Sequence, residues 1–116
     1  VFCALFNKTS FVALDGESSE PVGFVLGMLP AGRDAAYMHY LFVVEGRRRE
    51  GIARALTEAF MDGARKLGAT SANLLTSQAA PFYEALGFVR RNEIYGAGVA
   101  EYVATERGAE VFSARL

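Results

Sequence analysis

The hydrophobic period of the sequence changes from that of strands to that of a helix at a basic loop, and this change constrains the fold more than any other feature. Before the loop, turn sequences separate three apolar segments rich in strand-forming residues, at 10–15, 22–29 and 35–44. After it, apolar residues recur at helical spacing from Gly51 to Leu67, and Gly68 stands where a helix-ending glycine is expected. Because short turns join antiparallel strands, we expect a three-stranded meander followed by a helix.

The rest of the chain alternates between short strands and one short helix. We expect a strand over 71–76, a helix that begins at Pro81 and is closed by Gly87, and strands over 88–95 and 110–116. Residues 96–109 are compatible with a loop that contains either a short helix or a hairpin. The order β-β-β-α-β-α-β-β predicts an α+β domain with one central mixed sheet. With 116 residues, 52% of them hydrophobic, the chain can form a single domain over 1–116.

Composition excludes several classes of protein. The formal net charge of −1 argues against a general nucleic-acid binder, which would carry a basic excess. No apolar run approaches the roughly 20 residues that cross a bilayer, and no signal-peptide pattern is present. The single cysteine, Cys3, excludes an intrachain disulfide and fits a reducing compartment. We therefore expect a cytoplasmic protein that has neither nucleic acid nor membrane as a partner and holds no metal.

The stretch from Val43 to Leu56, VVEGRRREGIARAL, joins a strand to a helix through a basic loop that contains glycine. The first turn of a helix has backbone N–H groups without intrahelical partners, and the helix dipole adds positive potential there. Gly51 and Ala53 lack bulk, so a phosphate could approach the backbone, and arginines at 47, 48, 49 and 54 supply charge. This pattern predicts a phosphorylated ligand, with a pyrophosphate favoured. The alternative is a solvated basic loop before an ordinary core-facing helix.

Two motifs resemble those of one enzyme superfamily. Arg48 to Ala53, Arg-Arg-Glu-Gly-Ile-Ala, resembles the acetyl-CoA signature of the GNAT N-acetyltransferases, Arg/Gln-x-x-Gly-x-Gly/Ala. Ala80 to Phe88, APFYEALGF, is similar to the family's second hallmark, a short helix that carries Phe-Tyr-Glu and ends in Leu-Gly-Phe. The motifs occur in the family's order, one helix and one strand apart. The resemblance implies a GNAT fold, whose fourth and fifth strands splay apart, with the acetyl-CoA-binding core over 35–88.

The resemblance also implies which residues bind acetyl-CoA. In the family, a bulge on the fourth strand frees backbone groups that hold the pantetheine arm in the splay between the strands. The matching positions in this sequence are Leu41, Phe42 and Val43. The pyrophosphate is expected on the backbone of the loop and of the first helical turn, at Arg48, Arg49, Glu50, Gly51, Ile52, Ala53 and Arg54.

Two residues are candidates for catalysis. Tyr83 matches the tyrosine that many family members place near the CoA sulfur, where a phenol can donate a proton to the leaving thiolate; the alternative is that it only packs on CoA. His39 matches a position where some members carry a base that takes a proton from the amine, and at period two it would share a face with Tyr37, Leu41 and Val43. The alternative for His39 is a satisfied core residue. Glu45 is a weaker candidate for the base.

The predicted activity is direct transfer of an acetyl group from acetyl-CoA to a primary amine. An acetyl-enzyme is disfavoured because Cys3 lies far from both motifs. A small-molecule acceptor is slightly favoured over a protein N-terminus or lysine. A non-catalytic CoA-binding module is the main alternative, because the family's strand-five glutamate has no counterpart over 73–76.

One further departure concerns the acceptor pocket. The family normally has a first strand and two helices ahead of the meander, and the sequence shows none of them before residue 10. We therefore expect the native protein to be longer, or its acceptor pocket to be open or completed by a partner subunit. Homodimers are common in the family, so a homodimer is one such arrangement.

Overall fold

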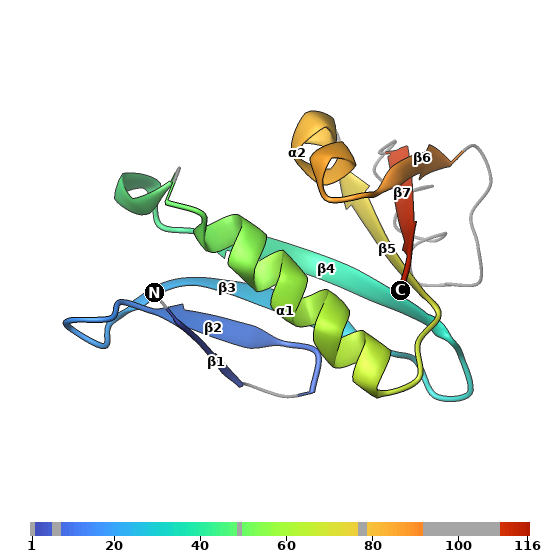
Figure 1. Cartoon of the computed structure of the whole chain (residues 1–116), viewed down its shortest axis with the longest axis horizontal. Helices are drawn as coiled ribbons and strands as arrows, with labels where there is room; N and C mark the ends of the chain where they lie inside the picture. The colour runs from blue at the N-terminus through green and yellow to red at the C-terminus, as the bar shows by residue number, and fades with distance from the viewer. Residues whose placement is uncertain (1, 6–7, 49, 77–78, 92–109) are drawn as a thin grey trace.

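A seven-stranded mixed sheet forms the body of the structure, a computed structural model that describes residues 2–5, 8–48, 50–76, 79–91 and 110–116 (Figure 1). The strand order is β1-β2-β3-β4-β5-β7-β6, and only β4 and β5 are parallel neighbours. The strands are β1 (Phe2–Leu5), β2 (Phe11–Leu14), β3 (Pro21–Met28), β4 (Ala35–Val43), β5 (Ser71–Thr76), β6 (Val89–Arg91) and β7 (Glu110–Arg115).

The predicted α+β fold with a mixed sheet is confirmed, and so is the meander formed by β2, β3 and β4. The expectation that no strand precedes the meander is wrong, because β1 pairs antiparallel with β2 from Phe2↔Leu14 to Leu5↔Phe11. Four residues give too short a periodic signal to be recognised without that partner. Only residues 6–10 link β1 to β2, a connection too short for the two helices that the family resemblance led us to seek ahead of the meander.

The longer helix, α1 (Ile52–Lys66), begins and ends close to the predicted positions. At its end Gly68 adopts a φ of +92°, its N–H donates to the Arg65 carbonyl at 3.0 Å, and the Ala69 N–H donates to the Ala64 carbonyl at 3.0 Å. This pair of bonds is a Schellman motif, which satisfies carbonyls that the helix leaves unpaired. A short 3₁₀ helix that the sequence did not predict, η1 (Glu45–Arg47), lies between β4 and α1.

The second helix, α2 (Ala80–Ala85), ends in the same way. Gly87 has a φ of +96° and donates to Glu84 at 3.1 Å, while the Phe88 N–H donates to the Tyr83 carbonyl at 3.0 Å. The chain then enters β6. The strand predicted over 88–95 is therefore present at 89–91, and its remainder, with 96–109, lies outside the described residues.

The main core lies between α1 and one face of the sheet. Helical positions four apart, Ile52, Leu56, Phe60 and Ala64, are at most 2% exposed and pack against Val25 and other residues of β3, β4 and β5. Burial of each of the three larger side chains contributes about 1.5–3 kcal/mol to the free energy of unfolding. Among the described residues, no helix combines the length and apolar character needed to span a membrane.

A bulge interrupts β4 at His39. Along the β3–β4 ladder, Leu26 pairs with Tyr40 and Gly27 pairs with Met38, so His39 is the extra residue on β4. Opposite the bulge, Gly27 allows the segment before β2 and Phe60 of α1 to approach β3 closely, because a Cβ there would lie 2.5 Å from the Thr9 carbonyl oxygen. An extra residue in one strand shifts the alternation of side chains by one position.

This bulge corrects one expectation about β4. At strict period two, Tyr37, His39, Leu41 and Val43 would share a face. In the structure Val43 belongs to the core under α1 with Leu41 packed against it, whereas Tyr37 belongs to a separate small cluster with Ala35. The expected common face is therefore wrong, because the bulge moves the residues after it to the other face.

Beyond the bulge, β4 and β5 separate. Their parallel pairing runs only from Ala35↔Ser71 to Met38↔Leu74, although β4 continues to Val43 and β5 to Thr76. The two ribbons diverge in Figure 1 toward the end that carries η1 and α2. The splay between the fourth strand of the chain and its parallel neighbour is thus present, as the sequence motifs led us to expect.

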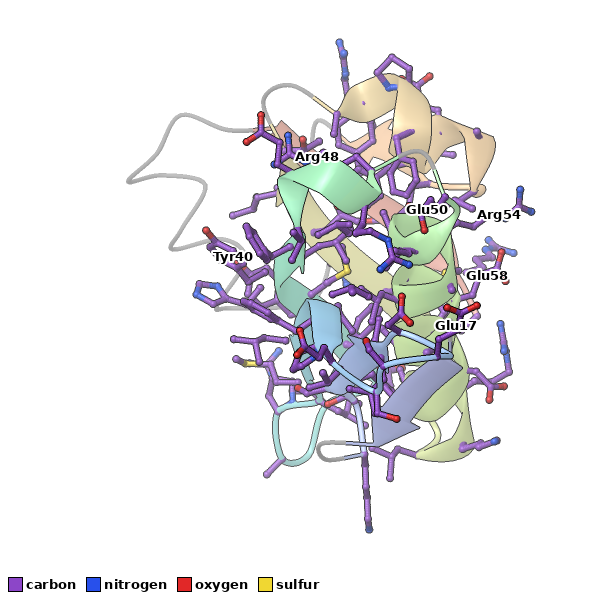
Figure 2. All side chains as sticks on the ribbon, turned by 90° about the vertical axis from the view of Figure 1, so that its left-hand side faces the viewer. Glu17, Tyr40, Arg48, Glu50, Arg54 and Glu58 are labelled. Atoms are coloured by element: carbon purple, nitrogen blue, oxygen red, sulfur yellow. The ribbon has the colours of Figure 1, made fainter. Side chains whose placement is uncertain are left out.

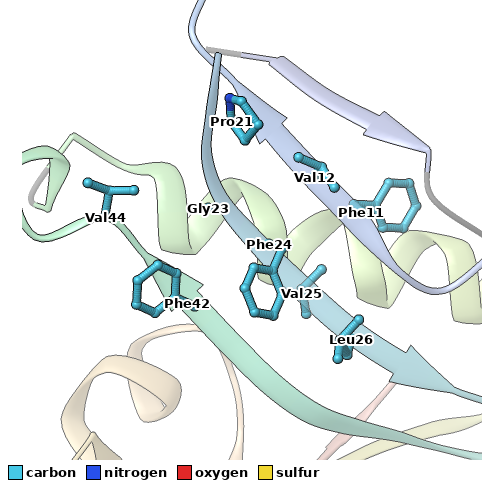
Figure 3. Close-up of a pocket in the computed structure, with 9 residues that line it drawn as sticks. All are labelled: Phe11, Val12, Pro21, Gly23, Phe24, Val25, Leu26, Phe42 and Val44. Carbon is cyan, nitrogen blue, oxygen red and sulfur yellow. The ribbon is translucent and has the colours of Figure 1, made fainter.

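The sheet face opposite α1 is rich in apolar and aromatic side chains on β3 and β4 (Figure 3). The Phe24 ring lies 5.8 Å from the Tyr40 ring and 5.7 Å from the Phe42 ring, measured between centroids. Together with Leu26 and Val44, Phe24 and Phe42 line a shallow cavity of about 320 Å³. Phe42 therefore directs its side chain away from α1.

Candidate functional site

The start of α1 has the features of an anion site. Gly51 is the N-cap residue, with φ of +79° and ψ of 9°, and no side chain caps the helix there. The first intrahelical bond runs from the Ala55 N–H to the Gly51 carbonyl at 3.0 Å. The amides of Ile52, Ala53 and Arg54 precede that bond and have no partner within the helix. The positive φ of Gly51 favours glycine at this position. A Cβ added to Gly51 would meet no atom within 4 Å, so the space beside it is open.

A cleft of about 270 Å³ opens at this helix end. It lies where β4, the basic loop, the first turn of α1 and α2 meet. The residues that line it are Val43, Arg47, Arg48, Gly51, Ile52, Ala53, Arg54 and Phe82. The cleft therefore gathers six of the predicted binding residues from β4, the loop and α1. Phe82 is a lining residue that we did not assign, although it stands within the second motif.

The arginines around the cleft differ in the partners they already have. Arg54 donates to Glu58 at 2.7 Å on the exposed surface of α1, and Arg48 is exposed without an ion pair to any described residue. In Figure 2, Tyr40 lies on one side of the sheet, and Glu50, Arg54 and Glu58 lie on the other, along α1. Arg49 lies outside the described residues.

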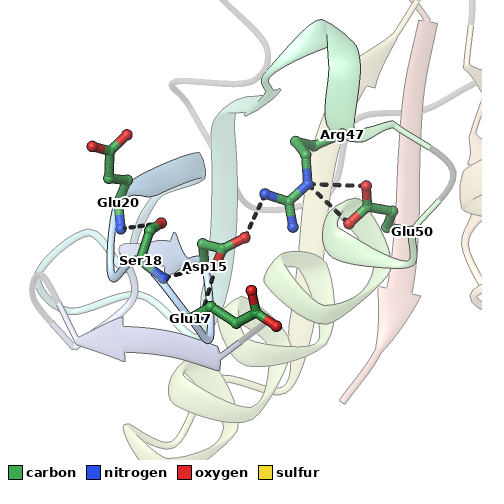
Figure 4. A network of polar contacts seen from close by, with 6 residues as sticks. All are labelled: Asp15, Glu17, Ser18, Glu20, Arg47 and Glu50. Carbon is green, nitrogen blue, oxygen red and sulfur yellow. Dashed lines mark hydrogen bonds and ion pairs between the residues drawn. The ribbon is translucent and has the colours of Figure 1, made fainter.

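Arg47 holds two carboxylates (Figure 4). Its Nη1 donates to Asp15 at 2.6 Å, and its Nε donates to both carboxylate oxygens of Glu50 at 3.0 and 2.9 Å. These contacts, with Glu50 first, raise the pKa of the Arg47 guanidinium further above its usual range. The expectation that Arg47 adds free positive charge to the anion site is therefore wrong, because two carboxylates already neutralise it.

Asp15 is the last residue of the first apolar segment, 10–15, and was not among the predicted site residues. Its Oδ1 accepts the backbone N–H groups of Ser18 at 3.0 Å and Glu17 at 2.8 Å, while Oδ2 accepts Arg47. Hydrogen bonds from the Ser18 and Glu17 amides, and to a smaller extent the contact with the Arg47 guanidinium, hold the pKa of Asp15 well below its usual range. The turn between β2 and β3 is thereby tied to the loop ahead of α1.

The open edge of β4 presents the backbone of alternate residues. The Val44 N–H donates to the Val22 carbonyl at 2.9 Å, so the backbone groups of Phe42 also point toward β3. Those of Leu41 and Val43 point the other way, toward β5, whose ladder with β4 ends at Met38. Leu41 and Val43 thus line the opening between the strands. Phe42 faces β3 with its backbone and the opposite cavity with its side chain.

Tyr83 is a buried residue of α2. It is 7% exposed, and its ring lies edge-on to those of Phe82 and Phe88, with centroids 5.0 and 5.8 Å away. Burial raises the pKa of Tyr83 to about 12, because the charged phenolate would lose its hydration. No described residue is a hydrogen-bond partner of its hydroxyl. Tyr83 itself does not line the cleft, but Phe82, its neighbour, does.

His39 lies at the bulge, one residue past the last β4–β5 pair. Its side chain is exposed, so the alternative of a core histidine is wrong. The His39 Nδ1 lies 3.3 Å from the hydroxyl oxygen of Tyr37, which is 1% exposed. His39 does not line the cleft. Glu45, the weaker candidate for the base, is exposed at the start of η1.

Comparison with known proteins identifies the family of the domain. The family model described as an acetyltransferase (GNAT) domain matches residues 7–90. Among curated proteins, no sequence match was found.

Three solved structures of similar fold are informative. N-acetylglutamate synthase from Neisseria gonorrhoeae, complexed with coenzyme A and N-acetyl-glutamate, has a TM-score of 0.81 and 17% identity over 93% of this chain. The PaiA N-acetyltransferase of Thermoplasma acidophilum, in complex with coenzyme A, has a TM-score of 0.71 and 14% identity over 92%. The NatC complex bound to Gag peptide and CoA has a TM-score of 0.69 and 23% identity over 93%.

The chain spans 26%, 60% and 71% of the length of those three chains, respectively. At these identities the structural likeness establishes the fold alone. The family assignment comes from the matched domain, which covers most of the sequence and includes the loop, both helices and the splayed strands. This chain belongs to the GNAT acetyltransferase family.

Proposed function

We propose that the chain binds acetyl-CoA and transfers its acetyl group directly to a primary amine. The observation that carries this proposal is the cleft at the first turn of α1, which lies beside the part of β4 where its pairing with β5 has ended. Its open space, its amides without helical partners and its exposed Arg48 suit a diphosphate.

Separate groups of the chain would hold the two parts of the cofactor. The amides of Ile52, Ala53 and Arg54 bind the diphosphate, and Arg48 adds charge. The backbone of Leu41 and Val43 binds the pantetheine arm by strand-like hydrogen bonds. Bound acetyl-CoA supplies the acetyl group as an activated thioester.

Tyr83 acts as a hydrogen-bond donor to the departing sulfur. With a pKa of about 12 its phenol stays protonated at neutral pH. A thiol has an unperturbed pKa near 8.5, so full proton transfer from this phenol to a thiolate would be uphill. A hydrogen bond from the neutral phenol stabilises developing negative charge on sulfur without that transfer.

His39 accepts a proton from the amine. A primary amine with an unperturbed pKa near 10 is mostly ammonium at neutral pH and has no lone pair for attack. An exposed imidazole at the bulge, where pairing between β4 and β5 has ended, is accessible for that proton. The buried hydroxyl of Tyr37 fixes one side of the ring through Nδ1.

The acceptor is a small amine. The N. gonorrhoeae relative is complexed with N-acetyl-glutamate, a small acetylated amino acid, which supports this choice. The NatC relative is bound to a peptide, so acetylation of a protein N-terminus or lysine is the alternative. A CoA-binding module without catalysis is the other alternative, favoured because β5 offers Asn73 but no carboxylate along Ser71–Thr76.

Two measurements test the proposal. Calorimetric titration of the intact protein with acetyl-CoA is expected to show one site, and a panel of amino acids, amino sugars, polyamines and peptides is expected to release free CoA with at least one acceptor. Absence of binding would reject the function as a whole. Binding with no turnover on any amine would favour the non-catalytic module.

A further inference from the structure

Three residues from two distant segments form a chain of charge-assisted contacts, which we call the bracket: Asp15, Arg47 and Glu50 (Figure 4). Asp15 belongs to the turn after β2, and the other two belong to the loop ahead of α1. Arg47 and Asp15 are 32 residues apart in sequence. The bracket therefore joins the first turn of the meander to the loop that precedes the diphosphate site.

The bracket does not resemble a ligand site of its own. Its one cation is shared by two carboxylates, so its formal charge is negative, and a diphosphate would have to displace Glu50 or Asp15 to reach Arg47. Both oxygens of Glu50 are held by the Arg47 Nε. This contact keeps an acidic side chain of the loop paired one residue before the helix N-cap.

We propose that Asp15 is a positioning residue for the diphosphate site and acts through Arg47. The Asp15 carboxylate is itself fixed by the Glu17 and Ser18 amides, so it offers Arg47 a rigid acceptor. Arg47 in turn binds Glu50 and so fixes the position of the loop that leads into Gly51. This inference rests on the proposed binding of acetyl-CoA at the start of α1.

Simple electrostatics predicts the opposite effect for a substitution of Asp15. Removal of a negative charge near a site for a polyanion should tighten binding. If Asp15 positions the loop, the same removal frees Arg47 and Glu50 and should weaken binding. The sign of the change in Kd therefore separates the two explanations.

The experiment compares CoA binding by the full chain, by three variants of the turn after β2, and by Arg47→Ala with and without Asp15→Asn, measured by calorimetry. Asp15→Asn keeps an oxygen that accepts the Glu17 and Ser18 amides, so the turn is preserved while the charged contact to Arg47 is lost. Glu17→Gln is the matched control, because it removes a carboxylate from the same turn that has no ion pair to any described residue. Asp15→Glu keeps the carboxylate.

We expect Asp15→Asn to raise the Kd for CoA about twofold to fivefold, the range of a partly exposed ion pair. Glu17→Gln should leave the Kd unchanged or slightly lower, and Asp15→Glu should recover part of the loss. In an Arg47→Ala background, Asp15→Asn should have no further effect, because the contact through which it acts is gone. If Asp15→Asn is poorly folded by circular dichroism, Asp15→Glu provides the test: it keeps the charge but alters the contact with Arg47, so a raised Kd supports the positioning role and an unchanged Kd contradicts it.

A Kd for Asp15→Asn equal to or below that of the unsubstituted chain would overturn the positioning role. Equal weakening by Asp15→Asn and Glu17→Gln would overturn it too, and so would a further loss in the Arg47→Ala background. Failure of the unsubstituted chain to bind CoA would instead reject the proposed function.

Discussion

Substitution of Gly51 tests the left-handed backbone conformation at the start of α1, because at this position the conformational cost of a side chain can be separated from steric clashes. Its φ of +79° lies in the left-handed region, whereas a Cβ placed on it would meet no atom within 4 Å. Substitution with alanine therefore carries a conformational cost without a steric clash. That cost is about 1–2 kcal/mol for a residue other than glycine in the left-handed conformation.

Gly46 provides a matched control in the same loop. A Cβ on Gly46 also meets no atom within 4 Å, and its φ is outside the left-handed range. Gly46→Ala should therefore be neutral or should stabilise the fold by up to about 1 kcal/mol, by restricting the unfolded chain. Gly51→Asn should cost less than Gly51→Ala, because asparagine tolerates the left-handed region.

The assay is thermal unfolding followed by circular dichroism, with CoA affinity measured on the same samples. For a domain of this size, 1–2 kcal/mol corresponds to a fall in Tm of about 4–10 °C. We expect that fall for Gly51→Ala, together with weaker CoA binding, since the strain acts at the N-cap. Equal Tm values for Gly51→Ala and Gly46→Ala would refute the left-handed N-cap.

Three further substitutions or conditions test other parts of the structure. Tyr83→Phe should lower kcat about tenfold to hundredfold with little change in the Kd for CoA, if its hydroxyl acts on the sulfur; an unchanged kcat would assign Tyr83 to packing. Because the pKa of Tyr83 is raised to about 12 in the fold, its contribution to stability is complete below about pH 10 and is lost as pH rises through 12. Urea unfolding between those pH values should show this loss, and it should be smaller in Tyr83→Phe. Asn73→Ala should lower the free energy of unfolding by about 1–3 kcal/mol, because the buried amide donates to the Ala36 carbonyl and accepts the Ser113 hydroxyl; urea titration with an unchanged midpoint would contradict this bridge between β4, β5 and β7.

Elements whose signals are local were predictable from the sequence. Both helices end at glycines, Gly68 and Gly87, and each glycine adopts the left-handed conformation that closes a helix. The helical positions of Ile52 and Phe60 follow from a spacing of four. The unpartnered start of α1 follows from Gly51, which stands immediately before the apolar run. The cleft at the start of α1 could be anticipated because its lining is mostly one continuous segment.

Features that depend on contacts between distant segments were not predictable. The bulge at His39 depends on the register between β3 and β4 near Gly27, which lies against Phe60 of α1. The contact between Asp15 and Arg47 joins a turn to a loop that no sequence period relates. The strand β1 becomes recognisable only when it is paired with β2.

Amide NMR spectra of the labelled protein, recorded during titration with acetyl-CoA, test the binding of the diphosphate by main-chain groups at the start of α1 most directly. The amides of Ile52, Ala53 and Arg54 should shift most, together with those of Leu41 and Val43 at the open strand edge. Large shifts at Phe24 and Phe42 on the opposite face, with no change at the helix start, would contradict the assignment.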